Sequence, residues 1–465
     1  MKWPKIFAEK SLNFQIISLL ALYTAIGHTL LFIYDIDHPE VFLNADRATQ
    51  RLVTIKAILA NEGDENLFYL LSQAGIVGDY LLHAIVYSAL GQYGVIIFQI
   101  LLLLVSIIFL FHFLFIIAKS RFIAIVAVVL YIHLPHTIVF PHQLTAEALF
   151  DPLIIFSFYG MAKYILVEQR WLLLMNSAFF VGLASLIRPV TLLWPIVVIA
   201  IMILTFQSTR RISHWASYLA IAIMPFILWM FFIFSQTGIF SMGSSNHDVS
   251  HNLYDRVNRI ITSFPLDQQQ FLIHRYLDNT ETKKMLSIPE YLSFVIDHPY
   301  GYFSQLGRDA LVFFIKSGIN RISLDYLDVK ARKNIQLWRS KWEKHGLFYS
   351  VKSVGKSHPK SMVIAIIGTI LFIPFMVSSL LGGLQCIKKY KQLSPPEQTV
   401  YILLLVFPVY LFIASQAANT MMSRHRAPGE FILCFFAALA LHQWYKARGK
   451  GEKEMCIPSL PKNSG

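Results

Sequence analysis

Apolar residues in this chain come in long blocks separated by short polar or charged stretches. Many blocks reach about twenty residues, the length a helix needs to cross a bilayer core about 30 Å thick. The pattern predicts ten spans, of which the third, fifth and sixth are short. They cover residues 14–34, 94–117, 122–135, 144–166, 171–187, 190–206, 215–236, 361–386, 398–418 and 429–445.

Composition favours the same fold class. Of 465 residues, 55% are hydrophobic and only 14% are charged, with a mean hydropathy of +0.54. Soluble domains are about 45–50% apolar and about 25% charged. The sequence therefore predicts an all-α polytopic membrane protein. The basic segment "MKWPKIFAEK" leads into an apolar run too long for a signal-peptide core, so we interpret that run as a retained first span.

The net charge of +13 predicts how the chain is oriented in the membrane. In a soluble protein it would suggest nucleic acid. Here the cations cluster in short segments between apolar runs, which is typical of cytoplasmic loops and leaves nucleic acid out as a partner. With a cytoplasmic N-terminus, one side collects Lys119/Arg121, Lys163/Arg170, Arg210/Arg211, Lys388/Lys389/Lys391 and Lys446/Arg448/Lys450/Lys453. We expect a bacterial plasma-membrane protein with both termini in the cytoplasm.

This orientation predicts two large outer loops, 35–93 and 237–360. In the first, Ala48, Leu52, Ile55 and Leu59 have helical spacing, and "GDYLLHAIVYSALG" is apolar but too short to span. Both segments suit helices along the outer interface. The second loop is rich in aromatic residues, which predicts a folded or membrane-hugging helical insert.

The loops divide the chain into three parts. An N-terminal transmembrane module covers 1–236, the large outer loop covers 237–360, and C-terminal spans with a basic tail cover 361–465. The three cysteines, Cys386, Cys434 and Cys456, show neither disulfide nor zinc spacing, so we expect a packing role for them.

Charge against the membrane surface is densest after the first span, in "YDIDHPEVFLNADRATQR". Asp46 begins a predicted interfacial helix beside Arg47 and Arg51. One interpretation is an N-terminal carboxylate favoured by the helix dipole. The other is a catalytic base kept ionised by its cationic neighbours.

Asp35 and Asp37 form an Asp-x-Asp pair at the exit of the same span. Such a pair can hold a divalent cation and a diphosphate. The alternative is an ordinary helix end entering water. The pair is one of two features that lead us to consider a divalent cation as a cofactor.

Histidines and acids gather in "HLPHTIVFPHQLTAEALFD". His133 and His136 are separated by Pro135, so they do not share a regular helix face. His142 could join a carboxylate in binding zinc or manganese, or simply lie at the interface. Glu147 is the stronger candidate, because an ionisable group inside an apolar helix is costly.

Arginines supply the second half of the candidate site. "SLIRPVTLLWP" places Arg188 at an outer turn fixed by Pro189. "MMSRHRAPGE" places Arg424, His425, Arg426 and Glu430 at the outer end of the last span pair. Arginine pairs bidentately with phosphate oxygens, although each of these could instead anchor a lipid headgroup. Together they suit a reaction with a phosphate leaving group.

Several segments resemble GT-C superfamily glycosyltransferases, whose members include protein O-mannosyltransferases and the lipid A aminoarabinose transferase. The resemblance is carried by "NADRATQRLVTIKAILANEGD", "ALGQYG", "HQLTAEALFDPLIIF", "LIRPVTLLWP", "IDHPYGYFSQLGRDALVFF" and "SRHRAP" before "FFAALAL". It spans nearly the whole chain through motif order, although each motif is degenerate. It differs in having Arg47 after Asp46, where many relatives carry a second acid, and in having fewer predicted spans.

The resemblance implies a GT-C-like helix bundle and a reaction. A polyprenyl-phosphate-linked sugar would be the donor, and a lipid, glycan or protein of the cell envelope the acceptor. Asp46 would be the base of an inverting transfer. Arg188 and Arg426 would bind the donor phosphate, and Glu147 would match the acidic position of the family's Thr-x-Glu segment. From the charge pattern itself we add Arg424 and Arg51 as donor-phosphate candidates, and His142, His425, Asp37 and Asp35 as further site candidates.

Three other functions stay open. An O-antigen polymerase or ligase would also act on prenyl-linked sugars, but we expect it to depend on arginine or histidine rather than a first-loop aspartate. A secondary transporter would place ionisable groups near the bilayer midplane. A non-catalytic lipid scaffold would need no base.

Overall fold

The computed structural model describes residues 3–43, 48–60, 77–206, 212–237, 245–262, 264–277, 286–315, 359–415 and 426–448. Within these ranges the regular elements are all helical. The first half contains α1 (Trp3–Asp37), η1 (Pro39–Leu43), α2 (Ala48–Ala60), α4 (Val77–Ala118), α5 (Arg121–Ile132), α6 (Pro135–Val139), η2 (Phe140–His142), α7 (Glu147–Leu166), α8 (Trp171–Ile187), η3 (Pro189–Thr191), α9 (Trp194–Phe206) and α10 (Ile212–Thr237). The second half contains α11 (Ser245–Ile261), α12 (Leu266–Tyr276), α13 (Ile288–Asp297), α14 (Pro299–Ile315), α19 (Pro359–Lys389), η7 (Tyr390–Gln392), α20 (Pro395–Ala414), η10 (Ala427–Gly429) and α21 (Glu430–Ala447).

The described helices make this a helical membrane protein. Six of them are long and apolar enough to span a bilayer, and a bent pair, α5 with α6 and η2, makes a seventh candidate. The six lie in α1, α4, α7, α10, α19 and α20. Helices also occupy the other predicted spans, in α8, α9 and α21, but these do not meet the same test, so ten spans stay a prediction.

Some predicted boundaries were wrong. The helix of the fourth span begins at Glu147 rather than at residue 144, because the Leu144 backbone N–H donates 2.9 Å to the Phe42 carbonyl instead of starting a helix. The third span ends at Ile132 and the chain bends by 60° before Pro135, which cannot continue a helical hydrogen-bond ladder. In α2, Leu59 is exposed although its spacing predicted a place in the apolar stripe with Ile55.

Helix α4 has two arms that meet at Gly91. This glycine has φ +66°, a left-handed conformation that disfavours side chains, and the helix changes direction there. The arm before Gly91 is the apolar stretch that the sequence set apart from the second span. Its location at the membrane interface stays a prediction.

The helices pack as a bundle around an aromatic core. Phe158 lies at the centre, with its ring edge-on to Phe407 and Phe431 at centroid distances of 4.9 and 5.5 Å. Helix α19 approaches α21 closely at Gly382, where a Cβ atom would collide with the Phe436 carbonyl. Such contact of two backbones needs a residue without a side chain.

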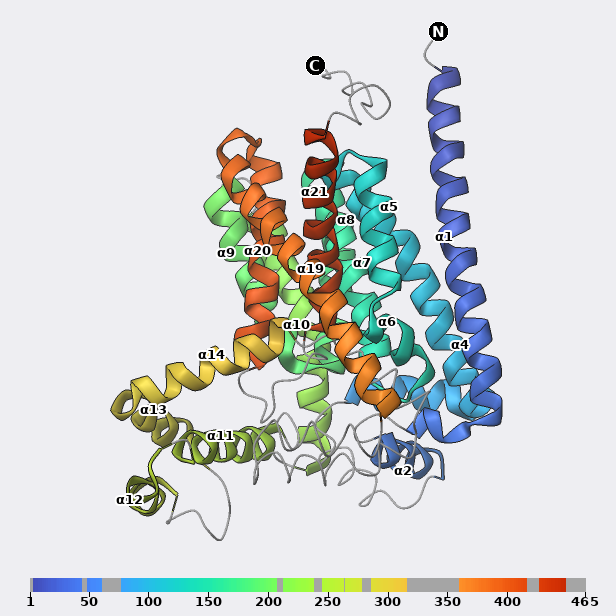
Figure 1. Cartoon of the computed structure of the whole chain (residues 1–465). Helices are drawn as coiled ribbons and strands as arrows, with labels where there is room; N and C mark the ends of the chain where they lie inside the picture. The colour runs from blue at the N-terminus through green and yellow to red at the C-terminus, as the bar shows by residue number, and fades with distance from the viewer. Residues whose placement is uncertain are drawn as a thin grey trace.

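The bundle has two different ends (Figure 1). At the terminal end, where α1 begins and α21 ends, Lys119 lies 2.7 Å from Glu397 of α20 and the Arg121 Nε donates 2.7 Å to Asn13. At the opposite end, which we call the site end, lie α2 and α6. Cations predicted to be cytoplasmic therefore share one end with the start of α1.

Helices α11 to α14 form a small insert at the site end (Figure 1). Its core is formed by buried residues such as Val257, Ile260 and Phe294. The Arg256 Nη2 donates 2.8 Å to Asp309, tying α11 to α14. In its described part, the large loop is thus folded and helical, as its aromatic content predicted.

Candidate functional site

Buried polar side chains from several separate segments lie at the site end of the bundle. We call this set the polar cluster. It comprises His28, Asp35, Arg51, Asp79, His83, His136, His142, Glu147, Arg188, Arg426 and Glu430. All but Arg188 are buried, which is unusual for so many ionisable groups.

The first pair joins the two helical segments of the first loop. The Arg51 Nε on α2 donates 2.7 Å to the fully buried Asp79 on α4. His83, one turn further along α4, lies 2.6 Å from the same carboxylate. Burial alone would lower the pKa of Arg51, but the Asp79 and Glu147 carboxylates outweigh it and raise that pKa above its ordinary value. Arg51 is therefore firmly cationic.

A second group links the end of α1 to the turn before α7. His142 lies 2.5 Å from the Asp35 carboxylate through Nδ1 and 2.8 Å from His28 Nδ1 through Nε2. The rings of His28 and His142 are stacked, with centroids 5.1 Å apart. Asp37 is exposed and takes no part. The structure thus separates the two carboxylates of the Asp-x-Asp pair.

A third pair joins α7 to the end of α8. The Arg188 Nη1 donates 3.1 Å to Glu147, which also accepts a hydrogen bond from Thr145. Arg188 is the C-cap of α8, and η3 begins at Pro189, so the turn read from the sequence is present. The Arg188 side chain is 18% exposed.

The fourth group is the most deeply buried. Arg426 donates to Glu430 from Nε at 3.0 Å and from Nη2 at 2.9 Å, and from Nη1 to the Phe313 carbonyl. Its guanidinium lies over the Phe372 ring, 4.8 Å from the centroid. His136 Nδ1 lies 3.1 Å from Glu430. The His136 Nε2 has no hydrogen-bond partner among the described residues.

Other predicted site residues are placed outside this cluster or cannot be placed. Asp46, the candidate base, lies outside the described residues, although η1 and α2 on either side of it are described. Arg424 and His425 also lie outside the described residues. His133 is an exposed residue whose Nε2 lies 2.8 Å from the Tyr23 hydroxyl.

The residues overlooked in the sequence are His28, Asp79, His83 and Asp151. Asp79 and His83 stand in a stretch that was read only as an apolar interfacial helix. Asp151 lies one turn after Glu147 on α7, and its buried Oδ1 has no hydrogen-bond partner among the described residues. The available signal was the same as for Glu147, an ionisable residue inside an apolar run.

A metal site is not evident in the described part of the chain. No three His, Cys, Asp or Glu side chains converge there as ligands would. Cys386 and Cys434 are buried free thiols, consistent with packing. The chemistry that the described residues offer is therefore that of carboxylates, histidines and guanidinium groups.

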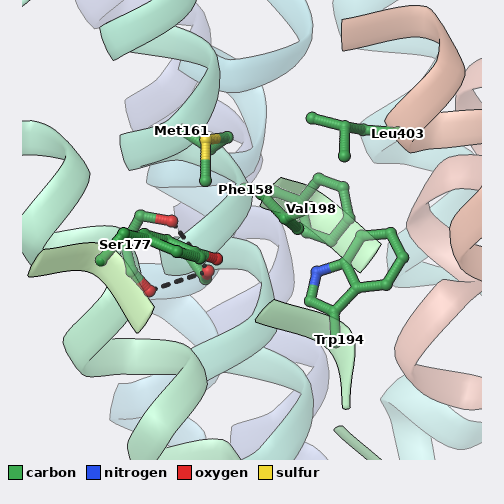
Figure 2. Close-up of a pocket in the computed structure, with 8 residues that line it drawn as sticks. Phe158, Met161, Ser177, Trp194, Val198 and Leu403 are labelled. Atoms are coloured by element: carbon green, nitrogen blue, oxygen red, sulfur yellow. Dashed lines mark hydrogen bonds between the residues drawn. The ribbon is translucent and has the colours of Figure 1, made fainter. Parts of the chain in front are cut away.

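A separate small pocket lies inside the bundle (Figure 2). Phe158, Met161, Trp194, Val198 and Leu403 form its apolar wall. Its polar side carries the Ser157 hydroxyl, which donates 2.9 Å to the Ser177 carbonyl. Ser157 is ten residues beyond Glu147 on α7, or about 15 Å along the helix. We therefore treat this pocket as part of the packing rather than of the polar cluster.

Fold and site together define a polytopic α-helical membrane protein with a buried polar cluster at the end opposite the start of α1 and the end of α21. Compared with protein-family models and with curated protein sequences, the chain matches none. The functional argument therefore rests on the residues themselves.

Proposed function

We propose that this chain is a GT-C-type membrane glycosyltransferase. It transfers a sugar from a polyprenyl-phosphate donor to an envelope acceptor at the site end, on the outer face of a bacterial plasma membrane. The proposal includes ten or more spans, with both termini in the cytoplasm. The main supporting observation is that Arg51, Arg188 and Arg426, from three distant segments, lie at one end of an apolar bundle.

Exposure separates the roles of the three arginines. The side chain of Arg188 is 18% exposed, against 9% for Arg51 and 0% for Arg426. Removing the carboxylate partner of a buried arginine is costly, so we assign Arg51 and Arg426 to the framework. Arg188 is the arginine that a phosphate can approach, with Glu147 orienting its guanidinium.

The reaction proposed is a single displacement. Asp46 accepts the proton of the acceptor hydroxyl, and that oxygen attacks the anomeric carbon. The bond from this carbon to the phosphate oxygen breaks, and polyprenyl phosphate leaves with the electron pair. Arg188 stabilises the charge that develops on the leaving phosphate, which needs no strong general acid. The anomeric configuration inverts.

The test measures release of free polyprenyl phosphate by purified protein in nanodiscs, with a panel of polyprenyl-phosphate sugars. Asp46→Asn should lower the rate by about 100-fold or more, because general-base catalysis contributes that much. Arg188→Gln should lower it by about 100-fold. Asp37→Asn, which changes an exposed carboxylate of the same loop, is the matched control and should keep full activity.

Two outcomes would contradict the proposal. If folded wild-type protein releases polyprenyl phosphate from no donor, the transfer reaction is wrong. If Asp46→Asn keeps the wild-type rate, the transfer stands but the base is another residue.

A secondary transporter is the second candidate, and Asp151 favours it. A buried carboxylate oxygen without a hydrogen-bond partner among the described residues, one turn into α7, is typical of a site that binds a proton or cation. Proteoliposomes with a pH-sensitive dye inside would show proton flux in wild type and a loss of flux in Asp151→Asn. Flux without any polyprenyl phosphate release would favour this function.

A further inference from the structure

The insert carries an exposed apolar stripe that its own core leaves uncovered. Along α13 it comprises Ile288, Leu292 and Ile296, which are 61%, 51% and 76% exposed. On α14 it continues through Tyr300 and Phe303, which are 87% and 64% exposed. Spacings of four residues put the α13 members on one face. Soluble surfaces rarely expose contiguous apolar side chains of this size.

The opposite face of α13 explains why the stripe faces outward. Phe294 is fully buried in the core of the insert, so α13 is already fixed by its other side. Its two carboxylates are also engaged away from the stripe. Glu290 caps the helix through Ser287, and Asp297 accepts 3.1 Å from Arg275 and a further bond from Tyr276 of α12. The stripe therefore contains no acidic residue.

Helix α14 connects this stripe to the ends of the spans. Phe313, near its C-terminal end, packs on Phe412 of α20 with ring centroids 5.4 Å apart. From there α14 extends sideways out of the bundle, and α13 lies at the far end of α14 (Figure 1). Tyr300 precedes Phe313 by thirteen residues, or about 20 Å of helix. The stripe is thus next to the bundle, near the level at which the spans end.

That location is where a bilayer surrounding the bundle has its headgroup boundary. The exposed aromatic residues Phe231, Phe232 and Phe234 near the end of α10 form a similar apolar surface on the bundle itself. Amphipathic helices bury such a face about 5–10 Å into this boundary, with aromatic and basic residues around it. The exposed Arg308, further along α14, is a basic residue of the same helix.

We propose that the stripe docks the insert on the outer leaflet of the membrane, with α13 and the start of α14 lying in the headgroup boundary. This contact holds the insert beside the bundle instead of letting it extend into the aqueous phase. The proposal does not depend on sugar transfer, because it concerns only the membrane contact of α13 and α14.

Spin labels test the contact in the full chain. Single cysteines replace Ile296, Leu292 or Ser293 in a background where the three native cysteines are alanine. Each is labelled in nanodiscs of phosphatidylethanolamine and phosphatidylglycerol, and collision rates with oxygen and with a nickel chelate are measured. Ser293 is the control position, since it is an exposed polar residue of the same helix whose side chain points about 100° around the helix axis from Leu292.

The expected result is a ratio of oxygen to nickel collisions several-fold higher at Ile296 and Leu292 than at Ser293. Equal ratios at Ile296→Cys and Ser293→Cys would mean that the stripe faces water, and would overturn the proposal. Labels at Ile296 that neither reagent reaches, with broadening between labels at full occupancy, would overturn it in favour of a second copy of the chain. Agreement between Leu292→Cys and Ile296→Cys excludes distortion by one substitution.

Discussion

The two ends of the bundle use charge in opposite ways. At the terminal end the ion pairs are exposed. Lys119 and Glu397 have side chains 69% and 23% exposed, and Arg170 and Glu168 78% and 37%. At the site end the corresponding figures are 0% and 2% for Arg426 and Glu430.

Exposed and buried ion pairs differ in what they contribute to the stability of the protein. Exposed pairs are worth about 0–1 kcal/mol, so the cations of the terminal end matter for orientation rather than for stability. Buried pairs cost several kcal/mol of desolvation and often stabilise less than apolar residues would. A chain that keeps several buried pairs at one end of an apolar bundle therefore has a use for them there. That is the physical basis for the site end as the location of the proposed active site.

The largest expected effect comes from separating the most buried pair. Arg426→Gln leaves Glu430 charged and buried with one cationic partner fewer, and should lower the free energy of unfolding by about 3–5 kcal/mol. Thermal unfolding in detergent, followed by the fluorescence of a thiol dye on the buried cysteines, measures it. Lys119→Gln is the control from the other end and should cost less than about 1 kcal/mol.

The double variant R426L/E430L sharpens the same test. Replacing both charges by apolar residues removes the stranded carboxylate, so stability should return toward the wild-type value. Equal losses in Arg426→Gln and Lys119→Gln would mean that the two ends do not differ as the structure indicates.

The next effect concerns the packing of α19 against α21 toward the terminal end. There, close backbone contact rather than buried ion pairs holds the helices together. Gly382→Ala pushes a methyl group into the Phe436 carbonyl of α21 and should cost about 2 kcal/mol. Gly383→Ala is its neighbour on the same helix, where the nearest atom to a new Cβ is 3.7 Å away. That change should be neutral or stabilising, since alanine favours helix. The same unfolding assay compares them, and a smaller loss at Gly382 than at Gly383 would argue against the α19–α21 contact.

A smaller effect is expected to distinguish the two carboxylates of the Asp-x-Asp pair. Asp35→Asn weakens the buried contact with His142 and should cost about 1–2 kcal/mol. Asp37→Asn alters an exposed side chain and should stay within about 0.5 kcal/mol. If calcium, magnesium or manganese raised the melting temperature of wild type but of neither variant, the two carboxylates would be acting together on a metal, contrary to their separation here.

Much of this fold could be predicted from the sequence, because apolar run length and loop charge are local properties. The helix 171–187 was predicted at its observed bounds. The same apolar runs and loop charges predicted that the acids and arginines gather at one end of the bundle. Predicted helix boundaries were wrong where a contact distant in sequence sets them. An example is the Leu144 backbone N–H, which donates to the Phe42 carbonyl.

The partners within the site could be predicted only in part. Arg426 and Glu430 are four residues apart on adjoining helical segments, so their pairing was within reach of the sequence. Asp35 and His142 are separated by 107 positions, and only the packing of α1 against η2 brings them together. A charge pattern predicts that ionisable groups share one end of the bundle, but not which of them meet.

The smallest effect is expected in the middle of the bundle, between the exposed ion pairs of the terminal end and the buried ion pairs of the site end. Tyr218 lines the small pocket and is 1% exposed, and its hydroxyl, with Ser177 as its polar neighbour, makes no hydrogen bond of good geometry among the described residues. Tyr218→Phe should leave the free energy of unfolding unchanged or raise it by up to about 1 kcal/mol, because a buried unsatisfied hydroxyl is removed. Ser157→Ala in the same pocket breaks a bond to the Ser177 carbonyl and should lower stability by about 1 kcal/mol. A clear loss in Tyr218→Phe would show that this hydroxyl is bound in the working protein, and the pocket would then join the site end as a polar site.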